Sequence, residues 1–323
     1  MPNNLKSALS TLRASLAEHR AALLSRLPSQ ALHEAAAAGR QSLLDELTAE
    51  VRRRFGLVLE HQIEAKLAQV LKSVSEVELA RWIGRLALLP SDHSEWLSVI
   101  ETLTVHESFF FRDASQLDHL QALLARDCRS GPPREITLWS AGCSMGEEAY
   151  TLAIVACLAL IEAGLAGEGP AGQISFRPGW SVRVIGTDIS RPALRRAETG
   201  FYPVAVPGAF RELYPELLRF FPEAGEGARR VTEEIRKLVS FGQGNLLSSH
   251  PHPLGEGQYF DVVCCRNVMI YLEEAGRSTA QSALIEGVRS GGYFLLSPTD
   301  TLLHVDFCTP IWDKSSLIYR KGG

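Results

Sequence analysis

Leucines recur at alternating steps near three and four residues along the first part of the chain. This pattern predicts an amphipathic helix over residues Asn4–Arg26, which ends before Pro28 because proline cannot continue it. One interpretation is a helix that lies on its own domain. The other is a seam, close to heptad spacing, that binds a partner helix or a second copy of the chain through residues 4–27.

Helical patterns continue from Ser29 to Pro90, most clearly over Gln41–Arg54 and Leu57–Val74, and this region contains no convincing strand. We therefore expect two helical regions at the start of the chain. The first is an extra amphipathic segment over residues 1–40, and the second is a helical domain over residues 41–103.

After residue 134 short apolar runs alternate with helical periods, which predicts an α/β fold with a mostly parallel sheet. The last two runs predict a final antiparallel hairpin. Two stretches break the alternation: the glycine- and proline-rich stretch Ala163–Trp180 predicts a loop, and residues 213–241 predict a small inserted β-subdomain. The seven predicted strands are the run at Ile136, Ser181–Ser190, Leu238–Asn245, Tyr259–Val268, Gly292–Ser297, Phe307–Asp313 and Leu317–Arg320.

The stretch Glu135–Tyr150 reads as strand, glycine-rich turn and helix. A turn of this kind lets a ligand approach bare backbone at a helix N-terminus. The spacing of Gly142 and Gly146 is not the dinucleotide-binding spacing, and Glu147 and Glu148 stand where a phosphate would require positive charge. A cationic, phosphate-free ligand such as S-adenosylmethionine fits better. The alternative is a glycine turn of any doubly wound domain, without a ligand.

Polar residues follow two of the predicted strands. Asp188 ends the second strand of the sheet, where a carboxylate can accept hydrogen bonds from both hydroxyls of a ribose. The alternative is a cap on the helix that begins at Arg191. Arg266, Asn267 and Tyr271 follow a buried strand at the same edge, where open α/β sheets bind ligands.

Three consecutive phenylalanines precede Arg112 in the segment Thr104–Asp113. Such a run is difficult to place on a surface, so we expect it to anchor a linker and to fix the direction of Arg112. The alternative is an aromatic helix start with a solvated arginine. The linker and the start of the α/β domain occupy residues 104–134, and that domain extends over residues 135–323.

Composition and charge narrow the function classes. Hydrophobic residues make up 46% of the chain and charged residues 22%, as in an ordinary globular protein, and the net charge of −4 disfavours general nucleic-acid binding. No signal peptide and no membrane span is evident, so we expect a cytoplasmic protein. Six cysteines without a C-x-x-C pair predict reduced, packed thiols, and we expect no metal.

Six motifs occur in order along the chain: F-F-R at Phe110–Arg112, W-S-A-G-C-S-M-G-E-E-A-Y at Trp139–Tyr150, G-T-D-I at Gly186–Ile189, G-F-Y at Gly200–Tyr202, N-L-L at Asn245–Leu247 and C-R-N-V-M-I-Y at Cys265–Tyr271. Together they resemble one family, the bacterial chemoreceptor glutamate O-methyltransferases of the CheR type, over roughly Leu57–Lys321. The resemblance implies a helical N-terminal domain, a Rossmann-like class I methyltransferase domain with an inserted β-subdomain, and methyl transfer from S-adenosylmethionine to receptor glutamates in chemotaxis, with S-adenosylhomocysteine as product.

Carried over by position, the resemblance implies catalytic roles for Arg112 and Tyr271, with a purely structural aromatic wedge as the alternative for Tyr271. The chain departs from the family pattern at His106 and Ser108, at Ser297–Asp300 and in the extra helix before Ser29. The residues expected to bind the cofactor are His106, Ser108, Arg112, Gly142, Glu147, Asp188, Asn245, Leu246, Arg266 and Asn267.

The expected partners are the cytoplasmic helices of methyl-accepting chemoreceptors, with the membrane approached only through the receptor. The segment Pro222–Arg230 is shorter and more acidic than in family members that bind a receptor C-terminal pentapeptide, so we expect independence of such a tether. Two alternatives stay open. One is a carboxyl methyltransferase with a non-receptor substrate, and the other is a non-catalytic S-adenosylmethionine-binding regulator.

Overall fold

The computed structural model describes residues 39–58, 67–69, 71–103, 107–204, 208–225, 227–248, 253–255 and 257–323. The chain divides into two compact units, Met1–Val105 with Tyr271–Gly276, and His106–Ile270 with Arg277–Gly323. The helix predicted over Asn4–Arg26 lies outside the described residues.

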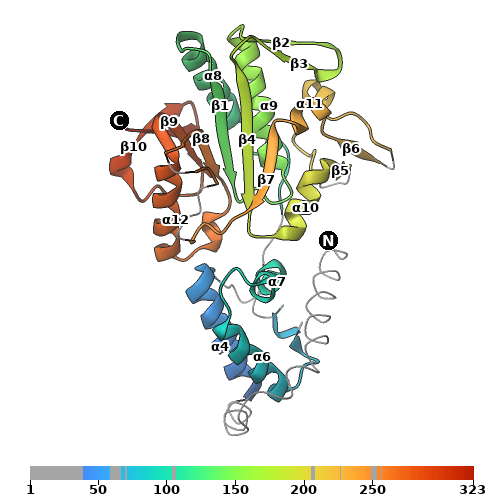
Figure 1. Ribbon diagram of the computed structural model, residues 1–323, viewed down its shortest axis with the longest axis vertical. Coiled ribbons are helices and arrows are strands. Elements are labelled where there is room, and N and C mark those ends of the chain that lie inside the picture. Colours follow the sequence, from blue (N-terminus) through green and yellow to red (C-terminus); the bar gives the residue numbers. More distant parts are fainter. Residues whose placement is uncertain are drawn as a thin grey trace. The chain divides into compact units, whose positions relative to one another are not determined.

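The helical unit contains α4 (Gly39–Phe55), α6 (Glu76–Leu88) and α7 (Ser94–Leu103) (Figure 1). The helix predicted over Gln41–Arg54 is confirmed as part of α4. Helix α6 begins with a capping box, in which the side chains of Ser75 and Glu78 each accept a hydrogen bond from the other's backbone N–H.

The helix predicted from Leu57 is wrong at its start. Leu57 forms an isolated antiparallel bridge with Leu272, and the backbone N–H of Val58 donates to the carbonyl of Tyr271 at 2.8 Å. Residues 59–66 of that prediction lie outside the described residues. The segment Tyr271–Gly276 thus belongs to the helical unit although its sequence neighbours belong to the other one.

The second unit is built on a seven-stranded sheet of order β10-β11-β9-β8-β1-β4-β7 (Figure 1). Pairs β1–β4, β1–β8, β4–β7 and β8–β9 are parallel, whereas β11 runs antiparallel to both β9 and β10. The predicted parallel sheet with a terminal antiparallel hairpin is therefore confirmed. The strands are β1 (Glu135–Ala141), β4 (Ser181–Asp188), β7 (Val239–Gln243), β8 (Phe260–Cys265), β9 (Val288–Leu296), β10 (Cys308–Asp313) and β11 (Ser316–Lys321).

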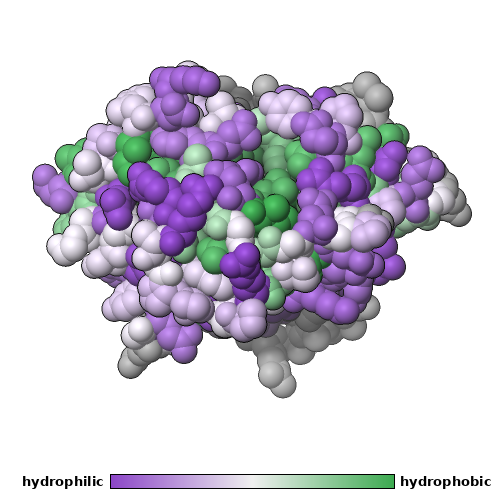
Figure 2. All heavy atoms as spheres, turned by 90° about the horizontal axis from the view of Figure 1, so that it is seen from above, coloured by the Kyte–Doolittle hydropathy of each residue, from purple (hydrophilic) through white to green (hydrophobic). Residues whose placement is uncertain are grey.

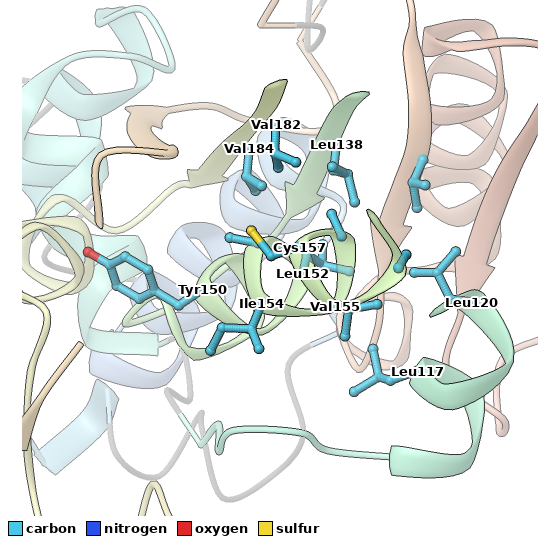
Figure 3. Close-up of a cluster of buried hydrophobic side chains, with 14 of the residues drawn as sticks. Leu117, Leu120, Leu138, Tyr150, Leu152, Ile154, Val155, Cys157, Val182 and Val184 are labelled. Carbon is cyan, nitrogen blue, oxygen red and sulfur yellow. The ribbon is translucent and has the colours of Figure 1, made fainter. Parts of the chain in front are cut away.

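Helix α9 (Glu147–Glu162) forms the centre of the core on one face of the sheet. Figure 3 shows its side chains between those of β1 and β4, such as Leu138 and Val184, and those of α8 (Ala114–Ser130), such as Leu117. Burial of each large apolar side chain contributes about 1.5–3 kcal/mol. This packing fixes the first turn of α9 against the carboxyl ends of β1 and β4. The other α-helices described for this unit are α10 (Arg191–Thr199), α11 (Glu233–Arg236) and α12 (Glu274–Gly287), of which the first three residues of α12 are grouped with the helical unit.

The inserted excursion contains strands β5 (Phe201–Pro203) and β6 (Ala228–Arg230), which pair antiparallel, and the 3₁₀ helix Pro215–Phe220. Its first strand therefore begins before residue 213. The stretch Ala163–Trp180 also differs from the predicted loop, because it contains the short antiparallel pair β2 (Ala166–Glu168) and β3 (Ile174–Phe176).

The three phenylalanines before Arg112 are buried, as predicted, with exposed fractions of 6%, 0% and 4%. The ring of Phe110 lies 4.4–5.2 Å from the rings of Tyr202, Phe210 and Phe221 in the excursion. Its backbone N–H donates to the carbonyl of Ala209 at 2.8 Å. The run therefore anchors the segment that carries Arg112 to the inserted excursion.

On the face shown in Figure 2, hydrophobic residues form patches that hydrophilic residues interrupt, as on ordinary protein surfaces. Among the described residues, no helix is long and apolar enough to cross a membrane. All six cysteines are free and buried, and burial raises the pKa of each thiol, so they act as packed, protonated side chains.

Candidate functional site

The candidate site lies at the carboxyl ends of four adjacent strands, β8, β1, β4 and β7. From β1 the chain proceeds to β4 and then β7 on one side, and it later returns to β8 on the other side of β1. The strand order thus reverses at β1, and ligands of open α/β sheets bind at such a switch point. The predicted residues Gly142, Asp188, Asn245 and Arg266 follow or end these four strands.

The glycine turn after β1 is held close to the neighbouring strands. Gly142 has a φ of +84°, and its N–H donates to the carbonyl of Thr187 at 2.7 Å. A Cβ atom at Gly142 would lie 2.4 Å from the side chain of Val268, and one at Gly146 would lie 2.8 Å from Ala197. Only glycine fits at both positions, so the turn offers bare backbone at the start of α9.

Asp188 fastens this turn to the end of β4. Its Oδ2 accepts a hydrogen bond from the N–H of Ser144 at 2.8 Å, and its Oδ1 accepts one from the N–H of Ser190 at 2.9 Å. The cap of α10 is Ser190, whose hydroxyl accepts from the N–H of Ala193, so the alternative role of Asp188 as helix cap is wrong. Each carboxylate oxygen keeps a second lone pair, and Asp188 is only half-buried. It thus has acceptors left for ribose hydroxyls.

Replacement of Asp188 with asparagine is expected to weaken cofactor binding at least about tenfold. The amide keeps one acceptor oxygen but loses the charge and turns a donor toward a backbone N–H or a ribose hydroxyl. Calorimetry with S-adenosylhomocysteine measures the change. The matched control is Ser190→Ala, which removes the helix cap at a cost of about 1 kcal/mol and should leave the affinity unchanged. Unchanged binding by Asp188→Asn would remove this residue from the cofactor site.

The two glutamates at the start of α9 have different environments. Glu148 accepts hydrogen bonds from the hydroxyl of Ser140 at 2.8 Å and from Nε of Arg266 at 2.9 Å. Glu147 is 1% exposed, and its Oε2 is buried without a hydrogen-bond partner among the described residues. Burial raises the pKa of Glu147 to about 7, against the lowering effects of its own backbone N–H, of Arg196 and of the Ser108 hydroxyl. A buried, unmatched carboxylate fits a ligand that brings a cation, such as the ammonium group of S-adenosylmethionine.

Cofactor affinity is expected to rise with pH through the neutral range. With a pKa of about 7, Glu147 is largely protonated below neutrality, and only its carboxylate form attracts an ammonium group. One pH unit below the pKa, about a tenth of the side chain is ionised, so the dissociation constant should be roughly tenfold larger there than at its high-pH plateau. Calorimetric titrations across this range measure the slope. The Glu147→Gln variant should bind weakly with a flat profile, and the same slope in both proteins would contradict the assignment.

Arg266 joins the helix start to the segment that carries Arg112. It is 6% exposed, and besides Glu148 it contacts the carbonyl of Arg112 through Nη1 at 2.6 Å and Oδ2 of Asp113 at 3.7 Å. The N–H of Phe111 donates to the hydroxyl of Thr151 at 3.2 Å, so the backbone of Arg112 is fixed on both sides. Nε and Nη1 of Arg266 thus have partners within the protein, and these contacts hold the Arg112 segment; its predicted contact with the cofactor stays a prediction.

Backbone strain gathers around the site. Among the described residues, five other than glycine have positive φ angles, and Lys314 is the one that lies in the terminal hairpin. The other four flank the site: Phe111 and Asp113 on either side of Arg112, Ser144 in the glycine turn and Asn267 after Arg266. Strained residues persist where the surrounding structure holds them and are typical of functional sites.

Asn267 connects the site to the stretch Ser297–Asp300, which departs from the family pattern. The amide of Asn267 donates to the hydroxyl of Ser297 at 3.1 Å, and that hydroxyl lies 3.1 Å from the hydroxyl of Thr299. Burial raises the pKa of Asp300, whose Oδ2 is buried without a hydrogen-bond partner among the residues described. This stretch therefore forms a polar wall at the carboxyl ends of β8 and β9.

The remaining predicted residues have the following places. Asn245 lies after β7, where its Oδ1 accepts from the N–H of Leu247 at 3.0 Å, and Leu246 beside it is half-buried. Tyr271 ends the 3₁₀ helix Met269–Tyr271 and belongs to the segment grouped with the helical unit. His106 lies outside the described residues.

No cluster of three potential metal ligands occurs in the described part of the chain.

Sequence reasoning missed the supporting contacts of Glu148, Asp113 and Thr151. The contact of Thr151 joins residues 40 positions apart in the chain and that of Glu148 joins residues 118 apart, and Asp113 contacts Arg266, which is also distant in the chain, so local patterns do not reveal them. The pair of acidic residues after Gly146 indicates a carboxylate at a ligand. The hydrophobic pattern alone does not show which of the two it is, and only the family resemblance singles out Glu147.

A family model described as CheR methyltransferase, SAM binding domain, matches residues 106–310. The chain is 31% identical to chemotaxis protein methyltransferase 1 of Vibrio cholerae over 69% of this chain and 72% of that protein. It is 26% identical to a chemotaxis protein methyltransferase of Borreliella burgdorferi over 80% of this chain and 88% of that protein. The N-methyltransferase NodS of Bradyrhizobium japonicum, solved with S-adenosyl-L-homocysteine, is 12% identical and aligns with a TM-score of 0.33 over 64% of this chain and 87% of that one.

Proposed function

Because the chain belongs to the CheR methyltransferase family, we propose that it methylates glutamate side chains of methyl-accepting chemoreceptors with S-adenosylmethionine as methyl donor. The observation that carries the proposal is the buried Glu147 carboxylate with its unmatched oxygen. Asp188 lies at the same edge of the sheet, and Arg266 links the backbone of Arg112 to Glu148, the neighbour of Glu147. This set offers one acceptor for an ammonium group, one for a ribose and a guanidinium for an incoming carboxylate. The proposal places the enzyme in the cytoplasm.

The cofactor supplies an activated methyl group bound to a sulfonium sulfur. The substrate glutamate has an ordinary pKa near 4.3, so at neutral pH it is already ionised and needs no general base. The protein's task is alignment and exclusion of water. We assign the binding of the ammonium group to Glu147, of the ribose to Asp188, and the orientation of the substrate carboxylate to Arg112. Arg266 keeps Arg112 in place through its carbonyl, and we place the Tyr271 hydroxyl beside the reacting groups.

The test is transfer of labelled methyl from S-adenosylmethionine to cytoplasmic fragments of candidate chemoreceptors, followed by mild base. Carboxyl methyl esters release methanol under these conditions, whereas N-methyl groups do not. Base-labile label on receptor glutamates supports the proposal. Label that is stable to base, or no transfer to any receptor, would overturn it.

A second candidate function is methylation of a carboxylate on a non-receptor protein or small molecule. The polar wall of Ser297, Thr299 and Asp300 favours it, because the sequence departs here from the pattern of the family that it resembles, and this wall bears hydroxyl groups. Base-labile transfer to a whole-cell protein or metabolite extract, combined with none to receptors, would select this candidate.

We predict no measurable affinity for a receptor C-terminal pentapeptide. The segment Pro222–Arg230 folds back on itself: the N–H of Arg230 donates to the carbonyl of Pro222 at 3.1 Å, and Glu223 bridges with Arg229. One side of β6 thus pairs with β5 and the other with this segment, so neither edge of β6 is left for an added peptide strand. Calorimetry with the pentapeptide checks this, and micromolar binding would refute it.

Deletion of Met1–Pro28 is expected to abolish methylation of the substrate while cofactor binding stays intact. Without a tether the enzyme lacks the raised effective concentration that linkage provides, typically in the millimolar range. Substrate must then bind another surface, and we propose the leucine seam of this segment or the basic N-terminal domain. The measurement compares methylation rates and cofactor affinity of the full and shortened chains. Full methylation by the shortened chain would show that the segment is not needed.

A further inference from the structure

Two guanidinium groups lie against the ring of Phe109. The guanidinium carbon of Arg211 is 3.9 Å from the ring centroid, and that of Arg112 is 5.4 Å from it. Arg211 comes from the inserted excursion, whereas Arg112 precedes α8. Because both distances are measured to the same ring centroid, the two guanidinium carbons are separated by at most their sum. This upper limit is comparable with the Debye length of about 8 Å at physiological ionic strength. Together they form a cationic site that neither element has alone.

A glutamate side chain already occupies part of this site. Oε1 of Glu107 accepts hydrogen bonds from Nη1 and Nη2 of Arg211, both at 3.1 Å, and its main-chain carbonyl lies 3.4 Å from Nη1 of Arg112. The side chains of Glu107 and Arg211 are 56% and 28% exposed. Ion pairs with this exposure contribute little to stability. Another carboxylate can therefore replace Glu107 on Arg211 with only a small loss of stability.

We propose that Arg211 is a second carboxylate-binding residue that positions the acidic substrate next to Arg112, and that the Glu107 carboxylate competes with the substrate for it. This inference rests on the proposed function, because it assumes a carboxylate substrate. It adds to that function a residue of the inserted excursion and an internal competitor. The excursion would then take part in recognition of the acceptor side chain itself, through a fork suited to carboxylates.

The chain offers a matched control in Arg219. Its guanidinium carbon lies 4.6 Å from the ring centroid of Phe220, and it pairs with the carboxylate of Glu168 in β2. Arg219 thus repeats the arrangement of Arg211, with a stacked ring and a paired glutamate, on the same excursion. No contact among the described residues links it to the Arg112 segment. A purely structural role of Arg211 would therefore predict similar effects of the two substitutions.

The experiment measures KM for the receptor fragment, kcat and cofactor affinity of the full chain. Arg211→Ala should raise KM about five- to tenfold, the loss expected for one exposed charged contact, while kcat and cofactor affinity stay within about twofold. Arg211→Lys should restore part of the loss, Arg219→Ala should leave KM unchanged, and Glu107→Gln should lower KM. This combination would support the inference.

Three outcomes would overturn it: a wild-type KM for Arg211→Ala, equal effects of Arg211→Ala and Arg219→Ala, or a higher KM for Glu107→Gln. If the wild-type enzyme transfers no base-labile methyl to any receptor fragment, the proposed function itself fails and the inference fails with it. Transfer by the wild type with an unchanged KM in Arg211→Ala overturns the inference alone.

Discussion

Replacement of Arg266 with methionine is expected to lower the free energy of unfolding of the second unit by about 3–5 kcal/mol. The side chains of Arg266 and Glu148 are only 2% and 11% exposed, so the substitution leaves the Glu148 carboxylate buried without its cation. The carbonyl of Arg112 loses its donor as well. Urea denaturation followed by a signal from the second unit measures the change, because one transition for the whole chain is not assured in a protein of two units.

The double variant Arg266→Met with Glu148→Gln separates folding from catalysis. It removes the uncompensated buried charge, so most of the lost stability should return. Turnover should stay low, because the Arg112 segment still lacks the hydrogen bond from residue 266. If Arg266→Met lowers the free energy of unfolding by less than about 1 kcal/mol, as the loss of an exposed ion pair would, that result would contradict the buried network.

Replacement of Arg112 with alanine is expected to reduce turnover at least about 100-fold, the loss typical of a misplaced substrate, and to change cofactor affinity less. The guanidinium lies above the Phe109 ring, beside the backbone that Arg266 and Thr151 hold, so it is fixed in direction. Single-turnover methylation and calorimetry measure the two quantities. Arg129→Ala, an exposed arginine at the end of α8, serves as the control and should retain full activity. Equal losses of turnover and cofactor affinity in Arg112→Ala would assign this residue to the cofactor instead.

Tyr271→Phe belongs with that prediction, because we assign its hydroxyl to the transferring end of the site. We expect a loss of turnover that exceeds any loss of cofactor affinity. Normal turnover would show that the ring alone matters, as an aromatic wedge at a helix start.

The sheet was predictable from the sequence because buried strands and helices have different hydrophobic periods. The strand before Gly142 and the terminal hairpin are examples that the structure confirms. The excursion was less predictable: β5 and β6 have three residues each, too few for a period, and β5 follows directly on the glycine that ends α10. A pattern of that length does not distinguish a strand from a loop.

The residue types of the site could be predicted from the sequence pattern, but the pattern did not show which residue takes which role. Glu147 and Glu148 are neighbours in sequence, yet an α-helix turns adjacent side chains about 100° apart, so one is left with an unmatched oxygen and the other pairs with Arg266. In the same way, Asp188 and Ser190 both suit a helix cap, and only the backbone geometry shows that Ser190 takes that role. Such choices depend on the direction of a side chain, which the sequence pattern does not contain.

The segment Tyr271–Gly276 affects how this protein could be recombined. It follows β8 and includes the first three residues of α12, yet it belongs to the helical unit. There it pairs with Leu57 and Val58, and Glu273 lies near Arg52. The chain therefore crosses between the units more than once, and no single cut separates them. A chimera that exchanges the helical unit with that of a relative must exchange residues 271–276 with it, because otherwise Leu272, 6% exposed here, would meet a foreign surface.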